Sequence, residues 1–264
     1  MRFYLGAVTK YQVHSPLVFE LVESVLEDER WYYAFSDVEA VRRKMLQSPV
    51  LLEMEDYGAP EAGEQPHVYR IPLRRLAPRI SSSPRQGRWL FRLAQLRQPQ
   101  RMLELGAGVG VGAMYLRSGA PEATFISLEG SEACAHVARA NLGILGLNRR
   151  ANVLSGPFQK TLPEALEKLG QPDLVFFDGH HQLAPTLDYF EQCLKTAHEK
   201  TLFVFDDIYW SAAMTAAWNR IKQHPRVTLT VDCFDLAFVF ITPDIKEKQH
   251  FRIVPARFKP WKMW

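Results

Sequence analysis

The sequence predicts an α/β protein with a doubly wound, mostly parallel sheet of seven strands, an antiparallel last strand and an N-terminal helical extension. From residue 84 onward, short apolar runs alternate with amphipathic helical segments. This alternation is typical of a parallel sheet that helices cover on both faces. The last two apolar runs are joined by only a few residues, too few for a crossover connection, so these strands should pair antiparallel at one edge.

The expected elements follow from the N-terminus onward. Ser15-Pro16 is a helix start, and apolar residues recur at helical spacing over residues 17–25. Residues 48–83 hold several prolines and no sustained period, which predicts a long connecting loop or small insertion over a neighbouring site. The seven expected strands are residues 101–105, 124–128, 151–154, 174–177, 202–205, 227–231 and 236–241. The expected helices between them are residues 88–96, a helix from about 112, and residues 131–145, 161–169, 185–197 and 211–224.

Composition excludes several classes of protein. The chain has 264 residues, 47% hydrophobic and 23% charged, which is ordinary for a globular protein and excludes collagen-like, coiled-coil and wholly disordered chains. Its three cysteines form no CxxC pair, which suits a reducing cytoplasm and excludes a cysteine-ligated zinc site. No uncharged apolar run approaches the roughly 18 residues of a membrane span. We therefore expect a cytoplasmic protein with no membrane partner.

Charge is segregated in the N-terminal third of the chain. Residues 51–64 carry five acids and no base, whereas residues 65–103 carry nine arginines and no acid. The net charge of +3 is too small to indicate nucleic-acid binding by itself. We interpret the arginine run as a solvated, acid-pairing surface in preference to a nucleic-acid patch.

A glycine cluster lies where the first predicted strand of the sheet turns into a helix. It runs Glu104-Leu-Gly106-Ala-Gly108-Val-Gly110-Val-Gly112, and such glycines let backbone approach a ligand closely. The string also satisfies a dinucleotide pattern, with Glu129 following at about 20 residues. However, a carboxylate at Glu104 would oppose a pyrophosphate and suits a cationic ligand, while Glu129 can accept two ribose hydroxyls. S-adenosylmethionine meets this description better than NAD.

At this motif the chain resembles a known family. Residues 103–110, LELGAGVG, look like the first motif of class I S-adenosylmethionine-dependent methyltransferases, most like the small-molecule O-methyltransferases of catechol and sugar type. Supporting segments are residues 127–131, 176–181 and 205–208. The resemblance implies a Rossmann-like methyltransferase fold over residues 81–243, preceded by an extension and connecting loop (1–80) and followed by a tail (244–264). The cofactor-binding residues that it implies are Glu104, Gly106, Ala107, Gly108, Val109 and Asp178 at the methionine and methyl end, Glu129 and Gly130 at the ribose, and Gly156, Pro157 and Phe158 at the adenine.

Acidic residues end two later strands. Asp178 and the pair Asp206-Asp207 should meet at the carboxyl edge of the sheet, where open α/β sheets bind ligands. In metal-dependent relatives the matching positions bind Mg²⁺, although catechol-type relatives have Asp-Asn where this chain has Asp206-Asp207. The resemblance thus makes Asp178, Asp206 and Asp207 a candidate metal site. The alternative is that Asp206 and Asp207 cap the next helix or accept hydrogen bonds from loop amides.

The catalytic residues that the resemblance implies are His181 and Asp178. Sugar-type relatives use a histidine three residues after the aspartate as general base, and here that position is His181; the alternative is a histidine that donates to a loop carbonyl. Among the aromatic residues, we expect Tyr209 and Trp210 to line an acceptor pocket.

The predicted function is methyl transfer from S-adenosylmethionine to an oxygen of a small-molecule acceptor, with Mg²⁺ as a candidate second cofactor and a homodimer as a candidate assembly. The alternatives are a nucleic-acid methyltransferase and a non-catalytic nucleoside-binding scaffold.

Overall fold

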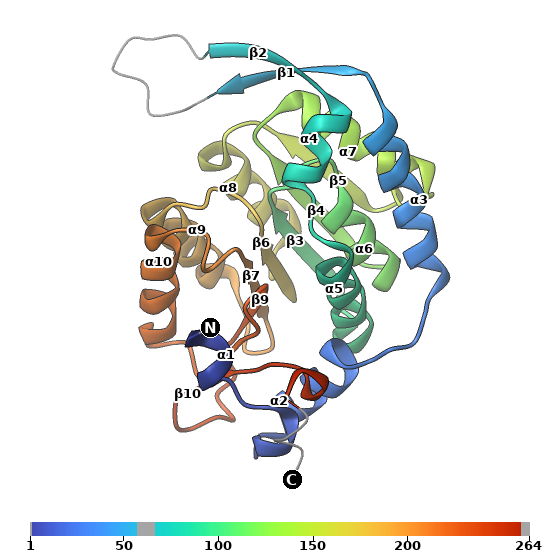
Figure 1. Ribbon diagram of the computed structural model, residues 1–264. Coiled ribbons are helices and arrows are strands. Elements are labelled where there is room, and N and C mark those ends of the chain that lie inside the picture. The colour runs from blue at the N-terminus through green and yellow to red at the C-terminus, as the bar shows by residue number, and fades with distance from the viewer. Residues whose placement is uncertain (1, 57–66, 260–264) are drawn as a thin grey trace.

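The computed structural model describes residues 2–56 and 67–259, and its centre is an eight-stranded sheet (Figure 1). The strand order is β10-β8-β9-β7-β6-β3-β4-β5. The five strands from β3 to β7 run parallel, and β9 runs antiparallel to both β7 and β8. The bounds are β3 (Arg101–Leu105), β4 (Thr124–Glu129), β5 (Ala151–Ser155), β6 (Leu174–Phe177), β7 (Leu202–Asp206), β8 (Leu229–Asp232), β9 (Leu236–Phe240) and β10 (Gln249–Arg252).

The predicted fold class is confirmed, but the strand count of seven is wrong by one. The eighth strand, β10, lies in the expected C-terminal tail and pairs parallel with β8 at the sheet edge. Its four residues, QHFR, alternate between half-buried and exposed, so β10 lacks the apolar run by which the other strands were recognised. Backbone pairing with a neighbouring strand, and not hydrophobic pattern, makes this segment a strand. Residues 260–264 of the expected tail lie outside the described residues.

Six helices cover the two faces of the sheet and bury two separate apolar cores. Side chains of α5, α6 and α7 pack with Met102 and Phe125 on one face, whereas those of α8, α9 and α10 pack with Leu103 and Ile126 on the other. Successive strand residues point to opposite faces, which is why neighbours such as Met102 and Leu103 enter different cores. The bounds are α5 (Pro84–Arg97), α6 (Val111–Gly119), α7 (Glu132–Ile144), α8 (Phe158–Leu169), α9 (Leu183–Thr196) and α10 (Ala212–Gln223).

The N-terminal region begins with short helices and the longer α3. The expected helix start at Ser15 is present, since its hydroxyl accepts a hydrogen bond from the Val18 amide. Residues of these helices share the core of α5 and α6. The bounds are α1 (Arg2–Gly6), η1 (Lys10–Gln12), α2 (Pro16–Leu21), η2 (Val22–Leu26) and α3 (Tyr33–Gln47). The C-terminal segment packs beside this region, where Val8 bridges to Ile253 and the Ala256 amide donates to Glu27 (Figure 1).

The segment expected to be a connecting loop carries regular structure. An antiparallel hairpin, β1 (Leu51–Asp56) and β2 (His67–Pro72), leads into α4 (Leu73–Ile80), which lies over the carboxyl edge of the sheet (Figure 1). The prolines were misleading because Pro72 ends a strand, where a missing amide hydrogen costs little, and because α4 contains Pro78 in a short two-turn helix. The hairpin and α4 place this insertion over the neighbouring site.

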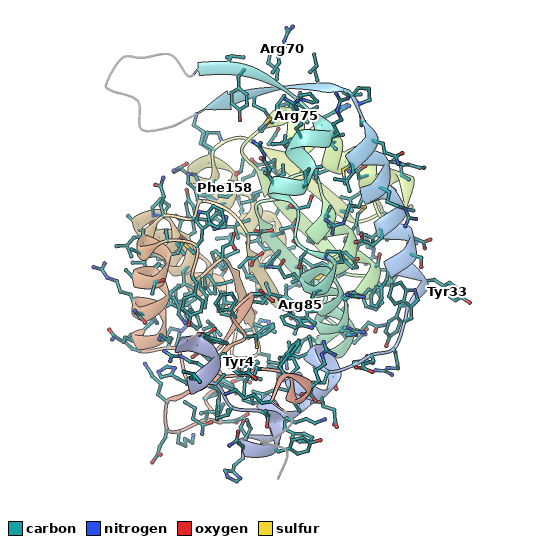
Figure 2. All side chains as sticks on the ribbon, in the orientation of Figure 1. Tyr4, Tyr33, Arg70, Arg75, Arg85 and Phe158 are labelled. Carbon is teal, nitrogen blue, oxygen red and sulfur yellow. The ribbon has the colours of Figure 1, made fainter. Side chains whose placement is uncertain are left out.

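Several arginines of the basic run pair with acids from distant segments. Arg85 forms an ion pair with Asp235, and Arg70 pairs with Glu53 across the hairpin (Figure 2). No helix in the described part of the chain is long and apolar enough to cross a membrane.

Candidate functional site

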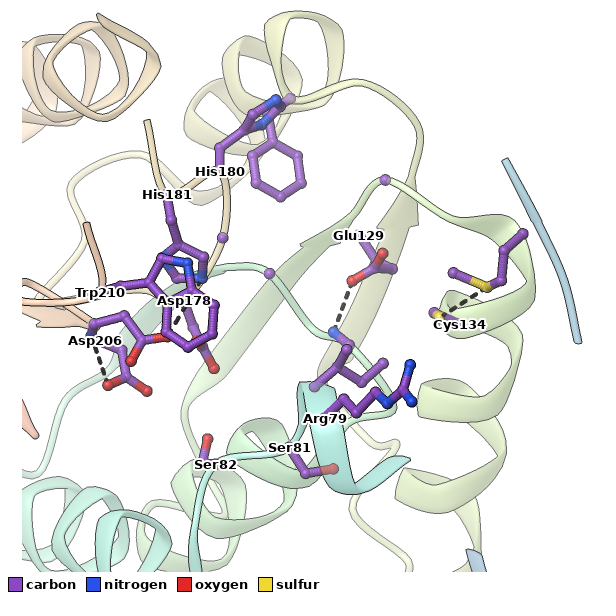
Figure 3. A pocket seen from close by; sticks show the side chains of 18 of the residues that line it. Arg79, Ser81, Ser82, Glu129, Cys134, Asp178, His180, His181, Asp206 and Trp210 are labelled. Carbon is purple, nitrogen blue, oxygen red and sulfur yellow. Dashed lines mark hydrogen bonds and ion pairs between the residues drawn. The ribbon is translucent and has the colours of Figure 1, made fainter. Parts of the chain in front are cut away.

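A cavity of about 840 Å³ opens at the carboxyl edge of the sheet. It is lined by the loops that follow β3, β4, β5, β6 and β7, and by residues of α4 and α5 from the N-terminal side. Of the residues predicted for the site, the cavity brings together Gly106, Gly108, Glu129, Gly130, Pro157, Phe158, Asp178, His181, Asp206, Asp207 and Trp210 (Figure 3). Its size is within the usual range of small-molecule sites.

The glycine loop is pressed between two other segments. A Cβ atom on Gly106 would lie 2.2 Å from the backbone oxygen of Asp178, and one on Gly108 would lie 2.9 Å from the backbone oxygen of Ile80. Both glycines also have positive φ, +109° and +52°. Only glycine meets these conditions without strain. Backbone atoms therefore form this part of the cavity surface.

Glu129 ends β4 and faces the cavity. Its carboxylate accepts hydrogen bonds from the amides of Gly108, at 2.7 Å, and Ser131, at 2.9 Å. Burial raises the pKa of Glu129, while these amide hydrogen bonds act in the opposite direction. Each carboxylate oxygen has a second lone pair, so both can still accept a ligand hydroxyl.

Glu104 does not line the cavity. Its side chain is 0% exposed beneath the glycine loop, where it accepts a hydrogen bond from the Ser127 hydroxyl. Its Oε1 atom has no hydrogen-bond partner among the described residues. Burial raises the pKa of Glu104 to about 8. A direct contact between Glu104 and the methionine end therefore has no support in the cavity lining, and the side chain lies behind the loop that it was predicted to assist.

Three further predicted cofactor contacts are absent from the described lining of the cavity. Ala107 and Val109 are buried under the loop, and Gly156 lines a separate hollow between β1 and α7. Pro157 and Phe158 remain in the cavity wall.

The raised pKa of Glu104 should make the free energy of unfolding depend on pH. Because its folded pKa of about 8 exceeds the ordinary value of 4.5, the folded state holds a proton that the unfolded state releases between these pH values. Stability should therefore fall as pH rises through this window, and Glu104→Gln should remove that part of the fall. We expect the free energy of unfolding, measured by urea titration at pH 5 and pH 8.5, to favour the variant increasingly at the higher pH. Parallel pH dependences of wild type and variant would contradict the assignment.

The three aspartates share the cavity, as predicted from their strand-end positions. Burial, followed by the charges of Asp206, Glu104 and Asp207, raises the pKa of Asp178 well above its usual value. Burial and the neighbouring Asp207 raise the pKa of Asp206 to about 7. The amide nitrogen of Gln86 on α5 donates to both oxygens of Asp206, at 2.8 and 3.1 Å. The cluster is thus short of positive charge and would favour a cationic ligand.

Neither Asp206 nor Asp207 caps the following helix. The hydroxyl of Ser211 performs that role by accepting from the Met214 amide, while Asp206 accepts from the Asp207 amide at 2.8 Å. Over residues 2–56 and 67–259, no three His, Cys, Asp or Glu side chains form a group that could hold a metal ion. Asp178, Asp206 and Asp207 nevertheless line one cavity with carboxylate oxygens, the ligand type that Mg²⁺ prefers, so a metal site there stays a prediction and we derive no step through it.

The two histidines after Asp178 face different neighbours. His181 Nε2 lies 3.7 Å from an oxygen of Asp207, and burial lowers the pKa of the imidazole, so the ring is neutral at pH 7. The ring of His180 packs edge-on against Phe158 at 5.4 Å between centroids. His181 is therefore the histidine that faces the aspartates.

Of the two aromatic residues expected at the acceptor pocket, only one is there. Trp210 is 72% exposed and lines the cavity. The hydroxyl of Tyr209 instead donates to Asp232, and its ring stacks on Phe234. The prediction for Tyr209 is wrong because the turn after β7 directs adjacent side chains to opposite sides.

Sequence reasoning missed the contribution of the N-terminal region to the cavity. Met54 of β1, Arg79 of α4, Ser81 and Gln86 all line it. The only available signal was the position of the insertion before the glycine motif, which indicated a neighbouring site but no particular residue.

Comparisons with known proteins agree with this geometry. Residues 103–208 match the family model described as a methyltransferase domain. The chain is 33% identical over 133 residues to a catechol O-methyltransferase of Niastella koreensis, and 34% identical over 132 residues to one of Mycobacterium tuberculosis. Each match covers 50% of this chain, and 59% and 58% of the respective relatives, so the chain spans less than two thirds of their length.

Solved structures show the same fold. An O-methyltransferase of Bacillus cereus in complex with SAH aligns with a TM-score of 0.57 at 21% identity, covering 90% of this chain and 99% of that one. The O-methyltransferase TomG of Streptomyces achromogenes in complex with SAM aligns with a TM-score of 0.57 at 19% identity, covering 81% and 91%. At these identities the likeness is one of fold. Residues 103–208 are thus similar to a methyltransferase domain, and the fold of the chain is similar to that of these solved O-methyltransferases.

Proposed function

We propose that this protein transfers a methyl group from S-adenosylmethionine to an oxygen of a small-molecule acceptor. The observation that carries the proposal is the single cavity in which the glycine loop, Glu129, Asp178 and His181 meet. The homodimer and the cytoplasmic location stay predictions from the sequence.

The donor side of the cavity suits S-adenosylmethionine. Gly106 and Gly108 line the cavity with backbone, since a side chain at either would collide with the backbone of Asp178 or Ile80, and Glu129 offers two lone pairs to the ribose hydroxyls. The carboxylates around Asp178 raise one another's pKa because their negative charges repel. A bound cation such as a sulfonium would offset that repulsion. S-adenosylmethionine supplies an electrophilic methyl group when bound.

The acceptor side has the groups that align an oxygen and take its proton. His181, neutral at pH 7, accepts the proton of the acceptor hydroxyl, and Asp207 beside it stabilises the resulting imidazolium. Trp210 lines the cavity and offers an apolar face to the acceptor. Holding the two reactants in line is the main contribution that such a site makes to methyl transfer.

The proposal is tested by donor binding. We expect S-adenosylmethionine and S-adenosylhomocysteine, but not NAD, to bind in calorimetry and to raise the melting temperature, because a ligand of the native state stabilises it. Glu129→Ala should weaken binding by about 1–3 kcal/mol, since ribose hydroxyls would lose a charged acceptor. NAD binding without S-adenosylmethionine binding would contradict the proposal, and an unchanged affinity of the variant would remove Glu129 from the site.

A further inference from the structure

A second cavity, of about 360 Å³, lies at the β10 edge of the sheet. It is lined by residues of β8 and β10, by the end of α10 and by Gly6 and Val8 from the N-terminal segment (Figure 1). The strands β9, β7 and β6 separate it from β3, which leads into the glycine loop. No described residue lines both this edge cavity and the cavity of the candidate functional site. Its volume is at the small end of the range for small-molecule sites.

The strands that line the edge cavity carry polar side chains on a face of the sheet that is apolar elsewhere. Thr230 and Asp232 of β8 lie opposite residues of β9 that belong to the apolar core under α8, α9 and α10. Directly opposite residues point to the same face, and β10 extends that face with His250 opposite Thr230 and Arg252 opposite Asp232. Lys222, near the end of α10, lines the same cavity.

Three of these polar side chains are satisfied within the fold. Thr230 and His250 share a hydrogen bond of 2.8 Å between the hydroxyl oxygen and Nδ1. The carboxylate of Asp232 accepts from the Tyr209 hydroxyl and, at 3.0 Å, from the Phe234 amide. These groups therefore do not need a ligand to complete their hydrogen bonds.

The two cations of the edge cavity, Lys222 and Arg252, are less well compensated. Over residues 2–56 and 67–259, neither of them makes a direct ion pair. Burial, followed by the charge of Arg252, lowers the pKa of Lys222, while Asp232 acts in the opposite direction. One carboxylate, already bound by two donors, thus faces two positive charges. The excess of positive charge in a partly buried cavity would be offset by an anion.

We infer that the edge cavity binds a phosphate group, held by Lys222 and Arg252. The two residues belong to different elements, α10 and β10, so they can donate to different oxygens of one ligand. A tetrahedral phosphate presents oxygens in several directions, whereas the two oxygens of a carboxylate match a single guanidinium. A phosphate group also carries about −1.5 to −2 charges at pH 7. This site goes beyond the proposed function, because none of its residues lines the donor cavity.

Binding of small anions tests the inference. We expect inorganic phosphate and glycerol phosphate to bind one-to-one in calorimetry, at an ionic strength held constant with chloride, with a Kd of about 1 mM or lower. Acetate should bind more weakly. Tighter binding of glycerol phosphate would identify a phosphorylated small molecule as the ligand, and equal binding would identify free phosphate. Lys222→Gln and Arg252→Gln should each raise the Kd by at least about 10-fold, as expected for a lost charge-assisted hydrogen bond.

The matched control is Arg220→Gln, an exposed arginine of α10 that is not in the lining of the edge cavity. It should leave the Kd of phosphate unchanged, and equal melting temperatures would show that all variants fold. Saturating S-adenosylhomocysteine should also leave that Kd unchanged, whereas competition would place the phosphate in the donor cavity and overturn the inference. Phosphate binding that does not saturate, acetate binding as tight as that of phosphate, or equal weakening by Arg220→Gln would overturn it too.

Discussion

Replacing His181 with alanine is expected to lower kcat by about 100- to 10,000-fold, the usual range for losing a general base. The imidazole lies in the cavity next to Asp207, and no other neutral base among the described lining residues faces the aspartates. The affinity for S-adenosylhomocysteine should stay unchanged, because His181 serves the acceptor and not the donor. Initial rates at saturating donor, together with calorimetry, check both parts.

The pH dependence of the reaction rate gives a second test of His181 as the general base. Burial holds the pKa of His181 below its ordinary value of 6.5, and only the neutral ring accepts a proton. The wild-type rate should therefore rise as pH increases through a pKa below 6.5 and be level above pH 7, whereas the variant should lack this rise. His250→Gln, on the edge strand β10 and outside the lining of the cavity that holds His181, is the matched control and should leave kcat unchanged. Turnover that requires Mg²⁺ and stops in EDTA would contradict a reaction that depends on His181 alone and would favour the predicted metal site.

Gly106→Ala is expected to destabilise the fold and abolish donor binding. Its Cβ would lie 2.2 Å from the Asp178 backbone oxygen, so β3 and β6 could not keep their present spacing at the cavity floor. The φ of +109° adds about 1–3 kcal/mol of backbone strain, and the close contact adds a further about 1–3 kcal/mol. Against a total stability of about 5–15 kcal/mol, this loss is readily measured by denaturant titration.

Gly143→Ala provides the control for that experiment. Gly143 lies in α7, has no atom within 4 Å of an added Cβ and has no positive φ. Alanine there should be neutral or stabilising by up to about 1 kcal/mol, because it favours the helix. A Gly106→Ala protein with wild-type stability and normal binding of S-adenosylhomocysteine would show that the loop can move away from Asp178.

The central sheet and the ends of its strands could be predicted from the sequence. Seven of the eight strands in the sheet carry apolar runs that alternate with helices, and in a parallel arrangement their carboxyl ends must share one edge. Position after a strand was therefore enough to bring Glu129, Asp178 and Asp206 to the same cavity. The edge strand β10 escaped prediction because an exposed edge strand of four residues needs no apolar run.

Packing decides which side chains at the carboxyl edge of the sheet point into the cavity. Glu104 and Gly106 are two residues apart, yet one is buried beneath the loop and the other lines the cavity. Tyr209 and Trp210 are adjacent, and only Trp210 faces the cavity. The period of a strand or a motif indicates where the backbone goes, but it does not indicate which neighbour a loop side chain meets.

The sequence by itself determined the fold class, the glycine loop and the strand-end acids, because these follow from local periodicity and from the geometry of parallel strands. Only the tertiary structure decided that Arg79, Ser81 and Gln86 line the cavity and that the Gln86 side chain donates to Asp206. These facts arise from contacts between segments far apart in the chain. Such contacts are set by how α4 and α5 pack over the sheet edge, and no pattern within either segment encodes them.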